Sequence, residues 1–276
     1  MPLVSLQVIT RGERELEDLL NSINMQTMHD IEVIAVISES DKWSNSILKK
    51  SGAKVISVPE HTRLLKARSI ACYASSGQFS LAIDPKRLLK PNCLEELVTL
   101  GKRFDMVIVG EGSVGKTYWA HLSELDRKSV TSESSLQRAI EEQTGTAVPR
   151  FFKTALQQEA YRNLHRKISQ GLADQITAGD DQLLFCECYR LSQSVTWTKE
   201  ILLEHQEDSS MKAIFKKYHW YGQTRKLLTG IPDFPQATNF SNRIRLGSGL
   251  SVTEWIAIQP LYLLRGAAFL LGYYFS

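Results

Sequence analysis

Cysteine is scarce in this sequence: the 276 residues include four, at positions 72, 93, 186 and 188. No two of them form a C-x-x-C pair, which argues against a structural zinc site. Such thiols are typical of buried, reduced side chains in a cytosolic protein rather than of a disulfide framework. A strong net charge is also missing. The value of +3 is too small by itself to indicate nucleic-acid binding, and no nucleic-acid partner is expected.

Targeting and repetitive segments are missing as well. The chain begins with a strand-like stretch rather than a basic segment followed by an apolar one, so we expect no cleaved signal peptide. No internal repeat or low-complexity tract is present. With 43% apolar and 23% charged residues, the composition is that of a folded protein, and the length suits one large domain or one domain with an appendage.

Strands and helices alternate along the first part of the chain. Short apolar runs predict strands at Leu3–Ile9, Ile31–Ile37, Ala53–Val58, Phe79–Ile83 and Met106–Val109. Between them, helices are predicted at Glu13–Met25, Trp43–Lys50, Leu64–Ser75 and Asn92–Leu100. Unbroken apolar strands favour a mostly parallel sheet covered on both faces, whose ligands bind beyond the carboxyl ends of the strands.

The pattern is less regular beyond residue 128. Phe151–Ile168 predicts a helix, whereas Gln182–Arg190 fits either a helix or a strand. Ser210–Leu228 is basic and aromatic, and the chain becomes apolar after Gly247. We therefore expect an α/β half over 1–130, a mixed half over 131–245 and an apolar tail over 246–276.

A set of short segments, in consistent order, resembles the family 2 glycosyltransferases, which are inverting enzymes of the GT-A fold. The segments are Val4–Thr10, Ser22–Thr27, Asp30–Ile34, Ala67–Ser69 with Gly77, Ile83–Lys86 and Lys90–Asn92. The resemblance implies a nucleotide-diphosphate-sugar donor, and it suggests a membrane-associated member from a prokaryote or archaeon. It places donor contacts at Thr10, Arg11, Glu39, Arg68, Asp84 and Lys86.

Two positions depart from the family pattern. Lys86 stands where the D-x-D motif has its second Asp, and Ile37 stands where an Asp usually ends the second strand, with Glu39 as a nearby substitute. The family uses its D-x-D to hold Mg²⁺ or Mn²⁺ against the diphosphate, and Asp84 and His205 are the candidate ligands here. Because a leaving diphosphate needs positive charge, our hypothesis is that Lys86 and Arg68 partly replace the metal.

The catalytic base of this family lies about 100 residues beyond the D-x-D, where Asp180 and Asp181 follow Gly179. Asp181 is the predicted base, with Asp180 beside it. Two carboxylates at the start of a helix are also explained by capping and by the helix dipole. Glu111 is a further candidate for contact with the acceptor.

Gly110–Thr117 matches the phosphate-binding pattern G-x-x-x-x-G-K-T and follows a predicted strand. An ATP- or GTP-binding protein is therefore one alternative. Against it, about 100 residues of strand–helix alternation precede this strand, and no apolar strand ending in Asp follows. A catalytically inactive relative that binds a nucleotide-sugar is the other alternative, because the D-x-D is incomplete.

Two segments point to a membrane surface. The basic and aromatic stretch 211–228 is typical of an interfacial helix, with a nucleic-acid face or a plain solvated helix as alternatives. The tail 250–275 is long enough to span a bilayer, but Arg265 within it would cost about 2.5–3.5 kcal/mol. We expect it to lie in the interface on the cytoplasmic side, next to a lipid-linked or glycan acceptor; a spanning helix or a soluble core helix are the alternatives.

Overall fold

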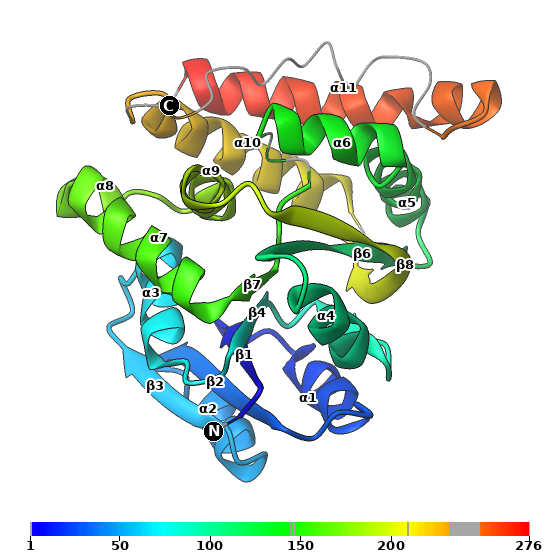
Figure 1. Ribbon diagram of the computed structural model, residues 1–276. Helices are drawn as coiled ribbons and strands as arrows, with labels where there is room; N and C mark the ends of the chain where they lie inside the picture. Colours follow the sequence, from blue (N-terminus) through cyan, green and yellow to red (C-terminus); the bar gives the residue numbers. More distant parts are fainter. Residues whose placement is uncertain are drawn as a thin grey trace.

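The computed structural model describes residues 2–143, 145, 147–208, 210–231, 234 and 249–275. Its strands are β1 Val4–Ile9, β2 Ile31–Ser38, β3 Lys54–Val58, β4 Phe79–Ile83, β5 Arg87–Leu89, β6 Met106–Val114, β7 Phe151–Lys153 and β8 Val195–Gln206. They form a single sheet in the order β3-β2-β1-β4-β7-β6-β8-β5 (Figure 1). The sheet contains strands from both the 1–130 and the 131–245 parts of the chain.

Most helices lie in the connections between strands, and the last two follow β8. They are α1 Leu16–Asn24, α2 Lys42–Lys50, α3 Leu64–Ala74, α4 Cys93–Gly101, α5 Tyr118–Val130, α6 Glu133–Glu141, α7 Thr154–Lys167, α8 Gln170–Ala173, α9 Asp180–Leu191, α10 Met211–Leu228 and α11 Val252–Tyr274. Side chains of β2 alternate between two cores: Ala35 and Ile37 pack with α1 and α2, while Ile34 and Val36 pack with α3. Both faces of this half of the sheet are therefore covered, as the apolar runs predict.

The sheet is mixed rather than uniformly parallel. The pairs β1–β2, β1–β4, β2–β3 and β6–β8 are parallel, and β4–β7, β6–β7 and β5–β8 are antiparallel. The five strands predicted from apolar runs are all present. Strands β5 and β7 are only three residues long, and β8 carries polar residues along its length, so no apolar run marks them.

The phosphate-loop alternative is wrong. Gly110–Val114 extend β6 and pair with β8, up to Val114 opposite Gln206, so they form no anion-binding loop. Gly110 is required there for a different reason, because a Cβ on it would lie 2.3 Å from the carbonyl oxygen of Glu200. The hydroxyl of Thr117 accepts the N–H of Ala120 at 3.2 Å and caps α5.

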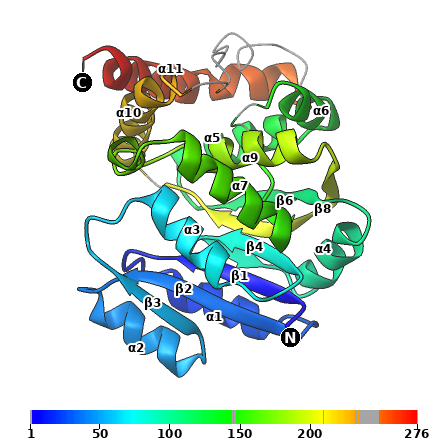
Figure 2. The same ribbon diagram turned by 60° about the vertical axis from the view of Figure 1, so that its left-hand side comes forward.

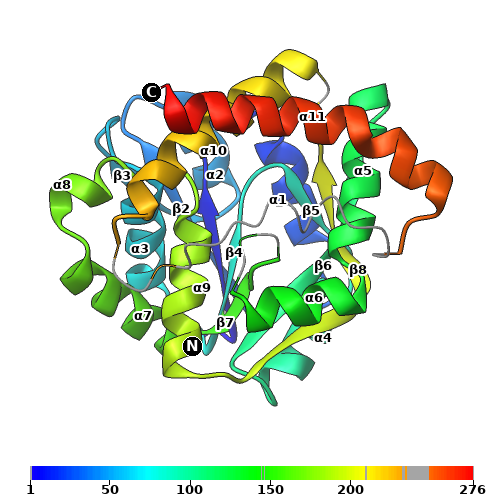
Figure 3. The ribbon, with the colours of Figure 1, turned by 90° about the horizontal axis from the view of Figure 1, so that it is seen from above.

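Helices α10 and α11 pack together as a layer at one end of the molecule, opposite α1 and α2 (Figures 1 and 2). Seen from above, α11 runs over this end and α10 lies against it (Figure 3). Arg265 is buried inside the protein. It pairs with Asp126 of α5 and donates to Ser123 Oγ at 3.1 Å, and its guanidinium lies 4.8 Å from the ring centre of Tyr218. By length and composition alone, α11 is able to cross a membrane.

The contact between α10 and α11 depends on glycine. A Cβ on Gly272 would lie 1.9 Å from the carbonyl oxygen of His219, and a Cβ on Gly222 would lie 2.1 Å from that of Phe269. We expect Gly272→Ala to separate the helices and to lower the free energy of unfolding by about 1–3 kcal/mol, as overpacking does. Gly171→Ala is the control, because a Cβ there meets nothing within 4 Å. Equal urea midpoints for the two variants would contradict this contact.

Candidate active site

The turn after β1 lies beside the start of α2. The hydroxyl of Thr10 donates to Glu13 at 2.7 Å, and Gly12 takes a left-handed φ of 86°. A Cβ on Gly12 would lie 3.4 Å from Oδ2 of Asp41, so the two loops are in contact. The carboxyl ends of β1 and β2 therefore meet at one rim, as predicted, and Arg11 and Glu39 are exposed there.

Asp41 is a candidate that sequence reasoning passed over in favour of Glu39. Its Oδ1 accepts the N–H of Ser44 at 3.0 Å and caps α2. Its Oδ2 is buried and has no hydrogen-bond partner among the described residues. A buried oxygen without a donor is costly, so a ligand N–H at this place would be stabilising. The sequence shows only an Asp at a helix start, which capping explains.

Arg68 on α3 and the two aspartates at the start of α9 form a second part of the rim. Arg68 Nε lies 3.0 Å from Oδ2 of Asp180, whose side chain is 2% exposed. Burial raises the pKa of Asp180 even though Arg68 opposes this effect. Asp181 is partly exposed, and its Oδ1 accepts the N–H of Gln182 at 2.9 Å. Asp180 is thus an anchor for Arg68, and Asp181 is the accessible carboxylate of the pair.

Residue Asp84, at the end of β4, belongs to a charged cluster. Arg87 of β5 pairs with Asp84 through Nη1 and donates from Nε to Oε1 of Glu111 at 3.0 Å. Glu111 also pairs with Arg150 and accepts from Nη1 of Arg127 at 2.6 Å. Burial disfavours its charge, but the three guanidinium groups outweigh burial and hold its pKa well below the usual range. Both oxygens of Glu111 are engaged by arginines, which leaves its predicted acceptor contact without support.

His205 and Glu207, from the end of β8, extend this cluster. His205 Nδ1 lies 3.0 Å from Oε1 of Glu207, which accepts from Nη2 of Arg127 at 2.6 Å. Burial, together with the nearby Arg87 cation, lowers the pKa of His205 to about 4, so the ring is neutral at pH 7. Its ring is therefore part of a buried hydrogen-bond network.

Helix α10 joins the two parts of the rim. Asp208 accepts from Lys86 at 3.0 Å and from Lys217 of α10 at 3.2 Å. One turn further along α10, Tyr221 lies within electrostatic range of Lys217, Asp181 and Arg87. Arg68 also interacts with both Asp181 and Tyr221. Helix α10 is thus ion-paired with the Lys86 side of the rim through Lys217 and Asp208, and Tyr221 on the same helix is electrostatically coupled to Asp181.

The residues present do not fit a bound divalent cation. Across the described part of the chain, no group of three or more His, Cys, Asp or Glu side chains is placed to hold a metal. Of the two predicted ligands, Asp84 is paired with Arg87, and His205 contacts Glu207 and Arg127. The side chains of Lys86, Arg87, Arg127, Arg150 and Lys217 carry positive charge in the same region.

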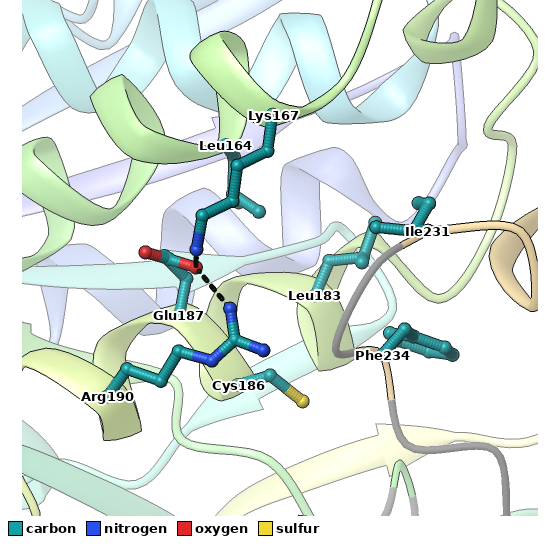
Figure 4. Close-up of a pocket in the computed structure, with 8 residues that line it drawn as sticks. All are labelled: Leu164, Lys167, Leu183, Cys186, Glu187, Arg190, Ile231 and Phe234. Carbon is teal, nitrogen blue, oxygen red and sulfur yellow. Dashed lines mark hydrogen bonds and ion pairs between the residues drawn. The ribbon is translucent and has the colours of Figure 1, made fainter.

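A small cavity lies elsewhere, between α7, α9 and the segment that follows α10 (Figure 4). Its volume is about 10 Å³, which is room for one water molecule. Glu187 in its wall accepts from Lys167 at 2.6 Å and from Arg190 at 3.2 Å. The cavity is too small to hold a sugar or a nucleotide.

A mixed sheet in this strand order, with helices in the connections, is the architecture of the GT-A glycosyltransferases. The family model for glycosyl transferase family 2 matches residues 5–165, and the chain belongs to that family. None of the curated proteins matches the chain.

Several solved structures share the fold at low sequence identity. Staphylococcus aureus TarS matches with a TM-score of 0.56 and 15% identity over 99% of this chain, which spans 54% of TarS; its 1–349 form has been solved with UDP-GlcNAc. Glucosyl-3-phosphoglycerate synthase from Mycobacterium tuberculosis, solved with Mn²⁺ and UDP, gives 0.56 and 16% over 84% of this chain and 81% of its own. A Pyrobaculum calidifontis mannosyltransferase, solved with GDP-Man and Mn²⁺, gives 0.53 and 15% over 98% and 73%.

Proposed function

We propose that this enzyme transfers a sugar, with inversion, from a nucleotide-diphosphate sugar to a lipid-linked acceptor at the cytoplasmic face of a membrane. The observation that supports the proposal is a set of cations, Arg87 paired with Asp84 and Arg68 paired with Asp180, together with the partly exposed carboxylate of Asp181 next to Asp180. A cation for a leaving diphosphate and a carboxylate for an acceptor hydroxyl are the two groups that this reaction needs.

The reaction follows from those two groups. Asp181 accepts the proton of the acceptor hydroxyl as its oxygen bonds to the anomeric carbon. The bond between that carbon and the diphosphate breaks on the opposite face, and its electron pair stays on the diphosphate oxygen. The added negative charge develops beside the cations of the rim, where fixed positive charge stabilises it most. Asp180 contributes by holding Arg68 rather than by taking the proton.

The nucleoside end of the donor is assigned to the rim formed by β1 and β2. Thr10 lies at the end of β1, and the unpaired Oδ2 of Asp41 faces the Thr10–Gly12 turn. Uracil and guanine both carry ring N–H groups that such an oxygen accepts. The exposed Arg11 and Glu39 flank this place and are assigned to the ribose side.

The experiment is a thermal-shift screen with UDP, GDP, ADP, ATP and GTP, with and without Mn²⁺. We expect UDP or GDP at about 100 times Kd to add about 2.7 kcal/mol, which is on the order of 5–10 °C for a protein of this size. The matching sugar nucleotides then serve as donors in a transfer assay. Binding without any turnover would identify a catalytically inactive relative, and no binding at all would reject the proposed function.

The membrane part of the proposal rests on the outer faces of α10 and α11. Exposed apolar side chains run along α11 at Val252, Ile256, Leu263, Leu270, Leu271 and Tyr274. Exposed Lys212 and Lys216 lie on α10 with Phe215 and Trp220, which suits the anionic surface of a bilayer. Since Arg265 is buried and ion-paired with Asp126 of α5, α11 is assigned to the plane of the interface rather than to a span.

Leu263→Glu combined with Leu270→Glu is expected to weaken binding to vesicles that contain phosphatidylglycerol by about 100-fold or more. Burial of each leucine contributes about 1.5–3 kcal/mol, and the added charges oppose insertion. Vesicle sedimentation measures the effect, and Leu191→Glu on α9, another exposed leucine, is the control. A native protein that ignores vesicles and is instead a dimer disrupted by the double variant would make this face a subunit interface.

A further inference from the structure

The guanidinium of Arg87 lies between two carboxylates. Its Nε donates to Glu111 at 3.0 Å and its Nη1 pairs with Asp84, while Nη2 takes part in neither of these two bonds. The side chain is 9% exposed, whereas the Asp84 carboxylate is 34% exposed. Arg87 is thus a buried cation that bridges two carboxylates, one of which is accessible to solvent. In many proteins a pair of carboxylates of this kind binds a divalent metal ion instead.

We propose that the guanidinium of Arg87 binds the diphosphate of the donor in place of a divalent metal, so that donor binding requires no metal ion. The inference rests on the proposed function and names the cation that acts in it. It also assigns Asp84 a different task from that of its D-x-D counterparts, because Asp84 orients an arginine. A guanidinium suits this purpose, since its planar N–H groups bond phosphate oxygens in pairs.

Arg87 is better placed for this than the two cations chosen from the sequence. The Nζ of Lys86 is ion-paired with Asp208, which also pairs with Lys217. Arg68 is ion-paired with the buried Asp180. Burial and the neighbouring Arg150 cation lower the pKa of Arg87 to about 10, so that it stays charged at neutral pH. The cation nearest the open Asp84 carboxylate is thus Arg87.

The rest of the cluster fixes the position of Arg87. Glu111 is also held by Arg127 and Arg150, so it cannot turn away from Arg87 without breaking three ion pairs. Arg127 in turn is held by Glu207. A cation that is oriented before the donor arrives needs no reorganisation when charge develops, which is the condition for strong electrostatic stabilisation.

The test is calorimetric binding of UDP and of GDP to the full chain, in EDTA and in Mn²⁺. For whichever nucleotide binds, we expect the two Kd values to agree within about threefold. Arg87→Met should weaken binding by about 10- to 150-fold, which is the loss of a charge-assisted hydrogen bond. Lys102→Met, which removes an exposed cation just after α4, should change Kd by less than about threefold. Arg87→Lys keeps the charge without the planar fork and should fall between the two.

Binding that disappears in EDTA and returns with Mn²⁺ would overturn the inference, as would Arg87→Met binding like the native protein. In both cases nucleotide binding, and with it the proposed function, would stand. If Arg87→Met does not fold, as judged by circular dichroism, the EDTA comparison on the native protein and on Arg87→Lys decides the matter. Failure of the native protein to bind any nucleoside diphosphate would instead reject the proposed function itself.

Discussion

Asp181→Asn should reduce the rate of sugar transfer by about 10²–10⁴-fold, the usual contribution of a general base. The amide keeps the size of the carboxylate and its bond to the N–H of Gln182, but it cannot accept the proton of the acceptor hydroxyl. Because the base acts on the acceptor, the affinity for the nucleotide should stay within about twofold. Transfer is measured as nucleotide release in the presence of acceptor, and binding by calorimetry.

Two matched variants separate catalysis from structure. Asp174→Asn changes an exposed aspartate near the end of α8 and should leave the rate unchanged. Asp180→Asn removes the partner of Arg68 and should lower the melting temperature as well as the rate. Retained turnover in Asp181→Asn would place the base elsewhere, and a loss of nucleotide affinity in the same variant would indicate a donor-binding role.

The second large effect is on stability. Glu111→Gln should lower the free energy of unfolding at pH 7 by about 3–5 kcal/mol, the usual result of removing one partner from a buried ion pair. Arg87, Arg127 and Arg150 would then face one another without the carboxylate that balances them. Urea unfolding measures the change, and Glu60→Gln at an exposed position is the control. A loss below about 1 kcal/mol would show that the cluster contributes little to stability.

The Glu111 carboxylate also makes the free energy of unfolding depend on pH. The folded-state pKa of Glu111 lies below its unfolded value of 4.5, so its stabilisation is present above pH 4.5 and is lost as the pH falls further. His205, whose pKa falls from 6.5 to about 4, adds a loss of stability between those two values. We therefore expect the unfolding free energy of Glu111→Gln to depend less on pH below 4.5 than that of the native protein.

The parts of the fold that were predictable are those with a local signal. The strands from Leu3 to Val109 are apolar runs, and their alternation with helices fixes which strand ends share a rim. Strand β8 was not predicted because polar residues such as Glu204 and His205 interrupt its apolar sequence. Strand β5 was not predicted because its three residues are too few to show a periodic pattern. Helix α11 was predicted as apolar, but the partner of Arg265 lies on α5, far away in the sequence.

The candidate site was predictable only where the family pattern is intact. Asp84, Arg68 and the Asp180–Asp181 pair were predicted from their order along the chain. The role proposed for Arg87 was not, because it depends on Glu111, which tertiary pairing brings beside it from 24 residues away. Asp41 was not predicted because a helix cap is a sufficient explanation for an Asp at this position. Only the structure shows that its second carboxylate oxygen is buried and has no hydrogen-bond partner among the described residues.

The central claim is that one rim holds both the cation for the donor diphosphate and the base for the acceptor. A crystal structure with bound UDP or GDP, whichever the screen selects, tests it most directly. We expect phosphate oxygens within hydrogen-bond distance of Arg87, and we expect the β-phosphate, which carries the sugar in the donor, to point toward Asp181. A nucleotide bound away from Arg87, or one whose diphosphate is shut off from Asp181 by α10, would contradict the claim.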